Sequence, residues 1–177
     1  MAGKTADPVD RKIESEFEKL DLNHDDHLDW SDYETLIGRY LQTARVSEND
    51  RRARALRAFY QLHWLELLRY AGVEGDRLSR NQFVAATRLA TTDSSRLNVA
   101  EVGGHVIFDL IDTNGDGEIS KDELANYLRG VWQIDPSDAA YSLEVLDRDG
   151  DQVISRSEFV SGINEHLETS RRTAARR

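Results

Sequence analysis

Oxygen-bearing side chains recur at alternating positions in three short acidic runs of this sequence. In the most regular run, Asp112, Asn114 and Asp116 are followed by Gly117 and by Glu123 at the twelfth position. A tight twelve-residue loop turns such side chains toward one point, and the final glutamate adds two oxygens. Hard divalent cations require six to eight oxygens of this kind. The run fits every specified position of the pattern D-x-[DN]-x-[DN]-G-x5-E, so we expect a calcium site here.

A second run, Asp147–Glu158, fits the same pattern except at its sixth position, where Gln152 stands in place of glycine. That position turns with positive φ, which glycine adopts without steric penalty. A side chain held there costs about 1–2 kcal/mol, which could weaken a site by roughly tenfold. This run has the acidic Asp149 where the most regular run has Asn114, and the extra negative charge offsets this cost. We therefore expect it to bind.

A third run lies near the N-terminus and departs from the pattern twice. Asp21, Asn23 and Asp25 keep the alternation, but Asp26 stands at the sixth position and Asp32 at the twelfth. Aspartate visits left-handed geometry more readily than most residues, so Asp26 is tolerable. Asp32 is one methylene shorter than glutamate and would reach an ion with a single oxygen. We therefore hypothesise a weaker or mixed Ca²⁺/Mg²⁺ site.

The three runs are named here by their order along the chain, as the first, third and fourth loops. The seventh residue of such a loop contributes its backbone carbonyl. The predicted metal ligands are Asp21, Asn23, Asp25, His27 and Asp32 in the first loop, Asp112, Asn114, Asp116, Glu118 and Glu123 in the third, and Asp147, Asp149, Asp151, Val153 and Glu158 in the fourth.

Apolar residues at helical spacing flank each loop and predict a helix on either side of it. Paired loops join at their eighth positions, which suits Ile119 to Ile154 and leaves Leu28 without a partner. An eroded loop over residues 71–82 would supply Leu78. Its positions 1, 3, 5 and 12 are Ala71, Val73, Gly75 and Gln82, so we expect it to hold no ion. A plain turn between two helices is the alternative.

A long helix is predicted before this second loop. Ser47 and Asp50 resemble a capping box that would start the helix at Ser47. The polar, turn-prone residues 91–98 are the best boundary between two halves. We therefore divide the chain into an N-terminal pair over residues 1–92 and a C-terminal pair with a basic tail over residues 93–177.

These features together resemble calerythrin and the sarcoplasmic calcium-binding proteins. Three acidic loops, a second loop that ends in Gly-Asp-Arg-Leu-Ser-Arg-Asn-Gln-Phe and the long helix before it carry the resemblance, over roughly residues 10–168. The family implies an all-α, compact fold of four EF-hands in two paired lobes, with short β-bridges between paired loops. It also implies a role in calcium buffering or calcium-responsive signalling. We expect no enzymatic activity, because calcium binding already explains the acidic clusters.

Two functions compete at this stage. The chain has one methionine, whereas calcium sensors of the open-groove kind use methionine-rich surfaces, so buffering outranks promiscuous target capture. The alternative is a photoprotein or luciferin-binding relative, whose ligand cavity would be lined by Tyr60, His63, Trp64, His105 and Trp132. The five histidines form no recognisable catalytic constellation.

Charge and composition restrict the partners. A net charge of −10 disfavours nucleic acid and anionic membrane surfaces and suits a protein that concentrates cations. We expect calcium ions as partners and a monomeric chain. An unidentified protein target is also compatible with the sequence. The absence of cysteine excludes thiolate zinc sites, and the N-terminal residues do not resemble a secretory signal, which predicts a cytoplasmic protein. The basic run over residues 171–177 is either a helix end or a docking tail.

Overall fold

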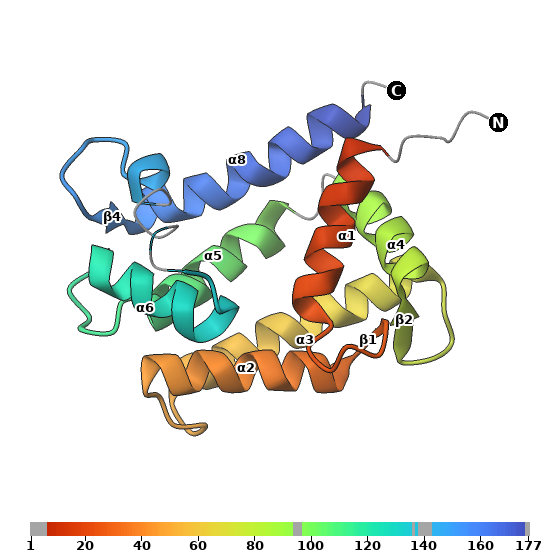
Figure 1. Cartoon of the computed structure of the whole chain (residues 1–177), viewed down its shortest axis with the longest axis horizontal. Helices are drawn as coiled ribbons and strands as arrows, with labels where there is room; N and C mark the ends of the chain where they lie inside the picture. The colour runs from red at the N-terminus through yellow and green to blue at the C-terminus, as the bar shows by residue number, and fades with distance from the viewer. Residues whose placement is uncertain (1–6, 94–96, 136, 138–142, 176–177) are drawn as a thin grey trace.

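A computed structural model describes residues 7–93, 97–135, 137 and 143–175 (Figure 1). Its helices are α1 (Pro8–Leu20), α2 (Trp30–Ala44), α3 (Arg51–Ala71), α4 (Arg80–Thr92), α5 (Leu97–Ile111), α6 (Lys121–Trp132) and α8 (Arg156–Ala175), and residues 143–146 are also helical. The strands β1 (His27–Asp29) and β2 (Arg77–Ser79) form one antiparallel pair, and β3 (Glu118–Ile119) and β4 (Ile154–Ser155) form another. The predicted all-α fold with short β-bridges is confirmed.

The loops themselves start the helices that follow them. In α6, Ser120 is the N-cap, and Glu123 at the third helical position accepts a bond from the Ser120 backbone, which completes a capping box. Asp29 with Asp32 does the same for α2, and Ser79 with Gln82 for α4. Each pair occupies positions 9 and 12 of its loop. The residue expected to close the cation cage therefore also stabilises the first turn of a helix.

The start of α3 differs from the prediction. Its N-cap is Asp50, whose side chain accepts a hydrogen bond from the Arg52 amide at 2.8 Å. Ser47 instead accepts a bond at its carbonyl from the Asp50 amide, in a turn that precedes the helix. The Arg52 guanidinium also pairs with the Asp50 carboxylate at 3.1 Å, so Asp50 has more partners as a cap than Ser47 could gain. The helix is nevertheless long, as expected, with 21 residues.

Two clusters of buried apolar side chains form the core. The smaller cluster lies under the third and fourth loops and contains Phe108, Ile111, Ile119, Leu124, Ile154 and Phe159. The larger cluster belongs mostly to α1–α4 but includes Leu110 and Val131 from the second half. The proposed boundary between halves stays a prediction. In the described part of the chain, no helix combines the length and apolar character needed to cross a membrane.

The two halves meet where α3 packs on α5 and α2 packs on α6 (Figure 1). A chain of hydrogen bonds crosses the second contact: Trp132 Nε1 donates to Tyr127 Oη at 2.8 Å, Tyr127 bonds Tyr40 at 3.2 Å, and Tyr60 donates to Tyr40 at 3.3 Å. Because these hydroxyls are buried, their bonds also tie the packing to one arrangement. The contact therefore depends on specific side chains from both halves.

Glycine allows the α2–α6 contact to be close. A methyl group added to Gly130 would lie 2.2 Å from Thr43 Oγ1 and 3.0 Å from Thr43 Cβ. We expect Gly130→Ala to lower the free energy of unfolding by about 1–3 kcal/mol, because the helices must separate. Chemical denaturation in chelator measures this change.

Gly38→Ala is the matched control, since an added methyl group there meets nothing within 4 Å in the same helix pair. Alanine favours a helix over glycine, so this variant should be neutral or stabilised by up to about 1 kcal/mol. Equal effects of the two substitutions would show that the close approach is unimportant.

Candidate metal-binding loops

The loops lie side by side in pairs at the two sheets. Leu28 of the first loop is opposite Leu78 of the second, and Ile119 of the third is opposite Ile154 of the fourth. These are the predicted eighth positions in both pairs. The second loop is therefore an eroded member of a pair, and the alternative of a plain turn between helices is wrong.

The third loop is organised by bonds from its own backbone to its acidic side chains. Asp112 Oδ1 accepts from the Gly115 amide at 2.8 Å and Oδ2 from the Gly117 amide at 3.0 Å. Asn114 accepts from the Asp116 amide at 2.8 Å. Glu123 accepts at one oxygen from the Thr113 amide at 2.9 Å. These bonds hold the predicted ligands around the inside of the loop.

The fourth loop repeats this pattern position by position. Asp147 accepts from the amides of residues 150 and 152, at 2.8 and 2.9 Å, and Asp149 accepts from the Asp151 amide at 3.2 Å. Glu158 accepts from the Arg148 amide at 2.9 Å. Carboxylate oxygens of Asp147, Asp149 and Asp151 also lie within 4.8 Å of one another. Three such oxygens in so small a space repel one another and suit a cation.

The first loop keeps most of this arrangement, although its first position accepts from the fifth-position amide where the other loops use the fourth. Asp21 accepts from the amides of Asp25 and Asp26 at 3.2 and 3.0 Å, and Asn23 accepts from the Asp25 amide at 2.9 Å. The Asp21 side chain belongs to a residue only 5% exposed. Two backbone amides thus hold this buried side chain in place inside the loop.

Asp32 at the twelfth position directs both oxygens to loop amides, while the number of oxygens it would give an ion stays a prediction. Both of its oxygens face the loop: Oδ1 accepts from the Leu22 amide and Oδ2 from the Asp29 amide, each at 3.1 Å. Glu158 makes the equivalent bonds with amides at positions 2 and 9. The shorter side chain thus reaches the same two donors, so its length alone does not turn one oxygen away from the loop.

The closing carboxylates differ in electrostatic environment. Burial raises the pKa of Asp32, although amide hydrogen bonds oppose the rise. In Glu123 burial also raises the pKa, but bonds from Ser120 and Thr113 outweigh it and the pKa is lowered. Hydrogen bonds from Ser155 and from the Arg148 amide lower the pKa of Glu158 to about 2. Of the three closing carboxylates, Asp32 is thus the one whose pKa is raised from its ordinary value.

Left-handed backbone occurs at the sixth position of all three loops, as predicted. φ is +62° at Asp26, +89° at Gly117 and +73° at Gln152. Sequence reasoning missed a second such position, the fourth, where His24 has φ +58°. Gly115 and Gly150 at the same position of the other loops were the signal that could have revealed it.

The donor chemistry fits a hard divalent cation. The convergent side chains are carboxylates and one amide per loop at most, all oxygen donors of the kind that Ca²⁺ and Mg²⁺ prefer. In the first and third loops the third position is an asparagine, and in the fourth it is an aspartate. A bound cation would offset the repulsion among these carboxylates and so stabilise the loops.

The second loop has a different interior. Its first position, Ala71, is the last residue of α3, and Gly72 caps that helix with φ +63°. Gln82 at the twelfth position accepts only from Ser79, at both the amide and the hydroxyl, each at 2.9 Å. The capping role of position 12 is thus retained, while the carboxylates are replaced.

Two arginines, one in the second loop and one at the start of α4, form ion pairs with the first loop. The sequence did not reveal these contacts. Arg77 forms an ion pair with Asp25 at 2.5 Å. Arg80 pairs with Asp26 at 3.1 Å and with Glu18 at 2.9 Å. Both contacts depend on how β1 pairs with β2, because the partners are far apart in the chain.

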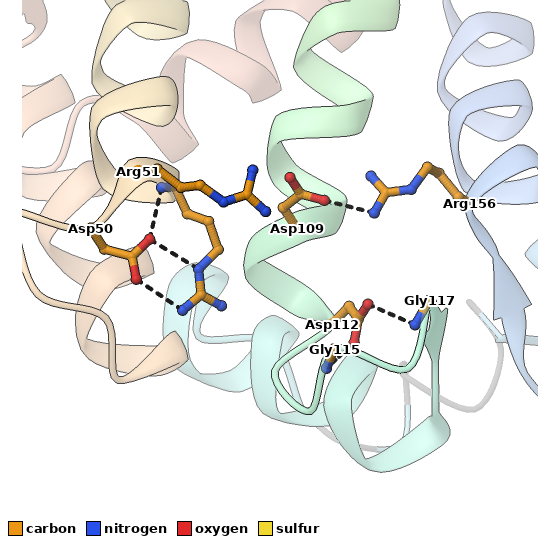
Figure 2. A pocket seen from close by; sticks show the side chains of 8 residues that line it. Asp50, Arg51, Asp109, Asp112, Gly115, Gly117 and Arg156 are labelled. Carbon is orange, nitrogen blue, oxygen red and sulfur yellow. Dashed lines mark hydrogen bonds and ion pairs between the residues drawn. The ribbon is translucent and has the colours of Figure 1, made fainter.

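A polar cleft of about 630 Å³ lies beside the third loop (Figure 2). Its lining residues are Asp50, Arg51, Arg52, Asp109, Asp112, Gly115, Gly117 and Arg156. Arg156 pairs with Asp109 at 2.6 Å and Arg52 with Asp50 at 3.1 Å. Figure 2 shows Asp109 between Asp50 and Arg156, each on a different helix or its end. A lining this charged is unlike the apolar pockets that bind aromatic small molecules.

The sequence profile of the EF-hand domain pair matches residues 105–163. The polcalcin Ole e 3 of Olea europaea is 40% identical over 60 residues, which are 33% of this chain and 71% of that protein. The luciferin-binding protein of Renilla reniformis is 26% identical over 163 residues, 89% of this chain and 84% of that protein. The chain belongs to the EF-hand family of calcium-binding proteins.

This chain spans only 65%, 33% and 62% of the lengths of the polcalcins from Alnus glutinosa, Hesperocyparis arizonica and Betula pendula, respectively. Among solved structures, a Streptomyces coelicolor calcium-binding protein has a TM-score of 0.74 at 24% identity, with 90% of this chain and 97% of that one covered. The sarcoplasmic calcium-binding protein of amphioxus has a TM-score of 0.64 at 21% identity, with 86% and 85% covered. The resemblance to the sarcoplasmic proteins is thus confirmed at the level of the fold.

The positive φ of Gln152 provides a test of loop strain. We expect Gln152→Gly to relieve about 1–2 kcal/mol of strain, less the entropy that glycine loses on folding. The net gain of up to about 1 kcal/mol should raise the Tm in chelator by about 2–4 °C.

Gln133→Gly is the control, because Gln133 caps α6 with φ +57° outside any loop. It should raise the Tm by a similar amount. A Tm that falls in Gln152→Gly while it rises in Gln133→Gly would contradict a left-handed Gln152 in the metal-free chain.

Proposed function

We propose that this protein is a calcium buffer that binds Ca²⁺ in its first, third and fourth loops. The observation that carries the proposal is the bond pattern shared by these loops: in each, the first position accepts from the sixth-position amide and the twelfth accepts from the second. The ligands are the fifteen residues named from the sequence, with His27, Glu118 and Val153 acting through their carbonyls. The second loop acts as a pairing partner.

Buffering is favoured over target capture by the packing between the halves. The buried hydroxyl chain from Tyr60 to Tyr127 joins α3, α2 and α6, and Tyr33, Tyr40 and Phe17 are among the largest fully buried side chains. Aromatic rings with defined contacts resist the opening that exposes a flexible methionine-rich groove. Calcium-responsive signalling remains the second form of this function, because the Streptomyces neighbour is described as part of calcium-mediated regulation.

The first loop is proposed as the weakest calcium site, or a mixed Ca²⁺/Mg²⁺ site. Burial raises the pKa of Asp32 above its ordinary value, whereas hydrogen bonds lower the pKa of the closing glutamates of the other two loops, Glu123 and Glu158. The third loop is proposed as the strongest, because glycine occupies its sixth position. We further propose a monomer in the cytoplasm with calcium ions as its partners and no nucleic-acid or membrane ligand.

The luciferin-binding alternative rests on the length of the match to the Renilla protein. Of the residues suggested for a cavity, Tyr60, His63 and Trp64 pack around the Tyr33 ring, with centroids 5.6, 6.3 and 5.4 Å away. His105 is exposed on α5, and Trp132 bonds Tyr127. The five do not line one space, which favours a core role, and coelenterazine binding by the full chain would revive the alternative.

Calorimetric titration of the metal-free chain tests the proposed sites. We expect three calcium ions per chain, and Asp112→Asn should remove the tightest site because affinity depends on the ligand charge in the loop. Millimolar Mg²⁺ should compete most strongly at the weakest site.

Asp76→Asn is the matched control, because Asp76 is an exposed aspartate of the second loop. It should leave three ions bound with unchanged affinity. A wild-type chain that binds no calcium, or an Asp76→Asn chain that loses a site, would contradict the proposed assignment.

Binding of a hydrophobic dye separates the two forms of the function. A buffer should show less than about a twofold rise in dye fluorescence on calcium addition, since its core stays closed. A rise of severalfold would instead indicate that calcium exposes apolar surface, and would favour a sensor with a protein target.

A further inference from the structure

The second loop contributes a positive charge to the first. Arg77 lies at its seventh position, in β2, opposite Asp29 of β1. From there its guanidinium forms an ion pair with Asp25 Oδ2 at 2.5 Å. Asp25 is the fifth position of the first loop, one of the side chains proposed to bind calcium.

Both oxygens of Asp25 are therefore engaged. Oδ1 accepts from the His27 amide at 3.0 Å, as the fifth position also does in the other two loops, and Oδ2 faces Arg77. In the third loop the equivalent Oδ2 of Asp116 accepts from a neutral donor, Asn114 Nδ2, at 2.8 Å. In the part of the chain that the structure describes, no arginine pairs with Asp116 or Asp151.

Arg80, the first residue of α4, holds that end of the helix close to the first loop without contacting a proposed ligand side chain. Its guanidinium pairs with Asp26 and Glu18 and lies over the Phe17 ring, 4.8 Å from its centroid. Three contacts from one side chain restrict where the start of α4 can lie. Since β2 leads directly into α4, this arrangement also keeps Arg77 beside Asp25.

We propose that Arg77 is a built-in counter-cation that lowers the calcium affinity of the first loop. The inference rests on the proposed function, in which that loop binds Ca²⁺. In the metal-free chain Arg77 offsets the repulsion among the loop carboxylates, and in the loaded chain its charge repels the ion. Both effects lower the calcium affinity of the first loop. The eroded second loop thereby sets the first loop to fill at higher calcium concentrations than the third and fourth.

The size of the effect follows from Coulomb's law. A unit positive charge one carboxylate away from a divalent ion, in a dielectric close to that of water, weakens binding by about five- to tenfold. Salt screens such an exposed interaction, so the effect should shrink as ionic strength rises.

Site-resolved calcium titration of Arg77→Gln tests the proposal. The Asp26 and His27 amide resonances of the full-length, metal-free chain report the first loop, and those of Gly117 and Val153 report the other two. We expect the midpoint of the first loop to fall by about five- to tenfold in Arg77→Gln, with midpoints of the other loops within about twofold of wild type. Arg77→Lys keeps the charge and should restore most of the wild-type midpoint.

Arg57→Gln is the matched control. Arg57 is exposed to a similar degree, 40% against 47% for Arg77, and pairs with Glu34, which belongs to no loop. It removes the same charge from the chain and should shift the first-loop midpoint by less than about twofold.

Each outcome decides the matter. A first-loop midpoint in Arg77→Gln that matches wild type, or an equal shift in Arg57→Gln, overturns the role of Arg77 while the proposed function stands. First-loop resonances that respond to calcium in neither chain overturn both. Resonances that respond only in Arg77→Gln support the counter-cation in its strongest form.

Discussion

Repulsion among carboxylates held close together is the constraint on which the rest of this structure depends. Each of the three acidic loops directs several acidic side chains to one point, and Asp21, Asp32 and Asp112 do so while buried. Backbone amides of the loop donate to them, which fixes the side chains before an ion arrives. A calcium ion at 100 times its dissociation constant would then add about 2.7 kcal/mol per site, if the unfolded chain does not bind it.

The remaining elements hold these loops in position. Positions 9 and 12 cap the outgoing helices, the β-bridges join the loops in pairs, and the α2–α6 and α3–α5 contacts join the pairs. The second loop keeps all of these mechanical features after losing its carboxylates. Through this pairing, Arg77 of the second loop lies within ion-pair distance of Asp25 in the first.

The sequence predicted what depends on residue identity within one loop. Side-chain types and spacing identified the three acidic loops, the eroded second loop with Leu78 opposite Leu28, and the left-handed sixth position. It failed in two ways. Local geometry was missed at the left-handed fourth position and at the start of α3, where Ser47 and Asp50 are both good caps and the Arg52 contact favours the second. The Arg77–Asp25 pair and the close approach at Gly130 were invisible because each joins segments far apart in the chain.

A crystal structure of the full-length chain grown in calcium tests the central claim most directly. We predict ions in the first, third and fourth loops, each bound by oxygens at about 2.3–2.6 Å, and none in the loop from Ala71 to Gln82. Loops that keep their internal amide bonds and hold no ion in millimolar calcium would contradict the account.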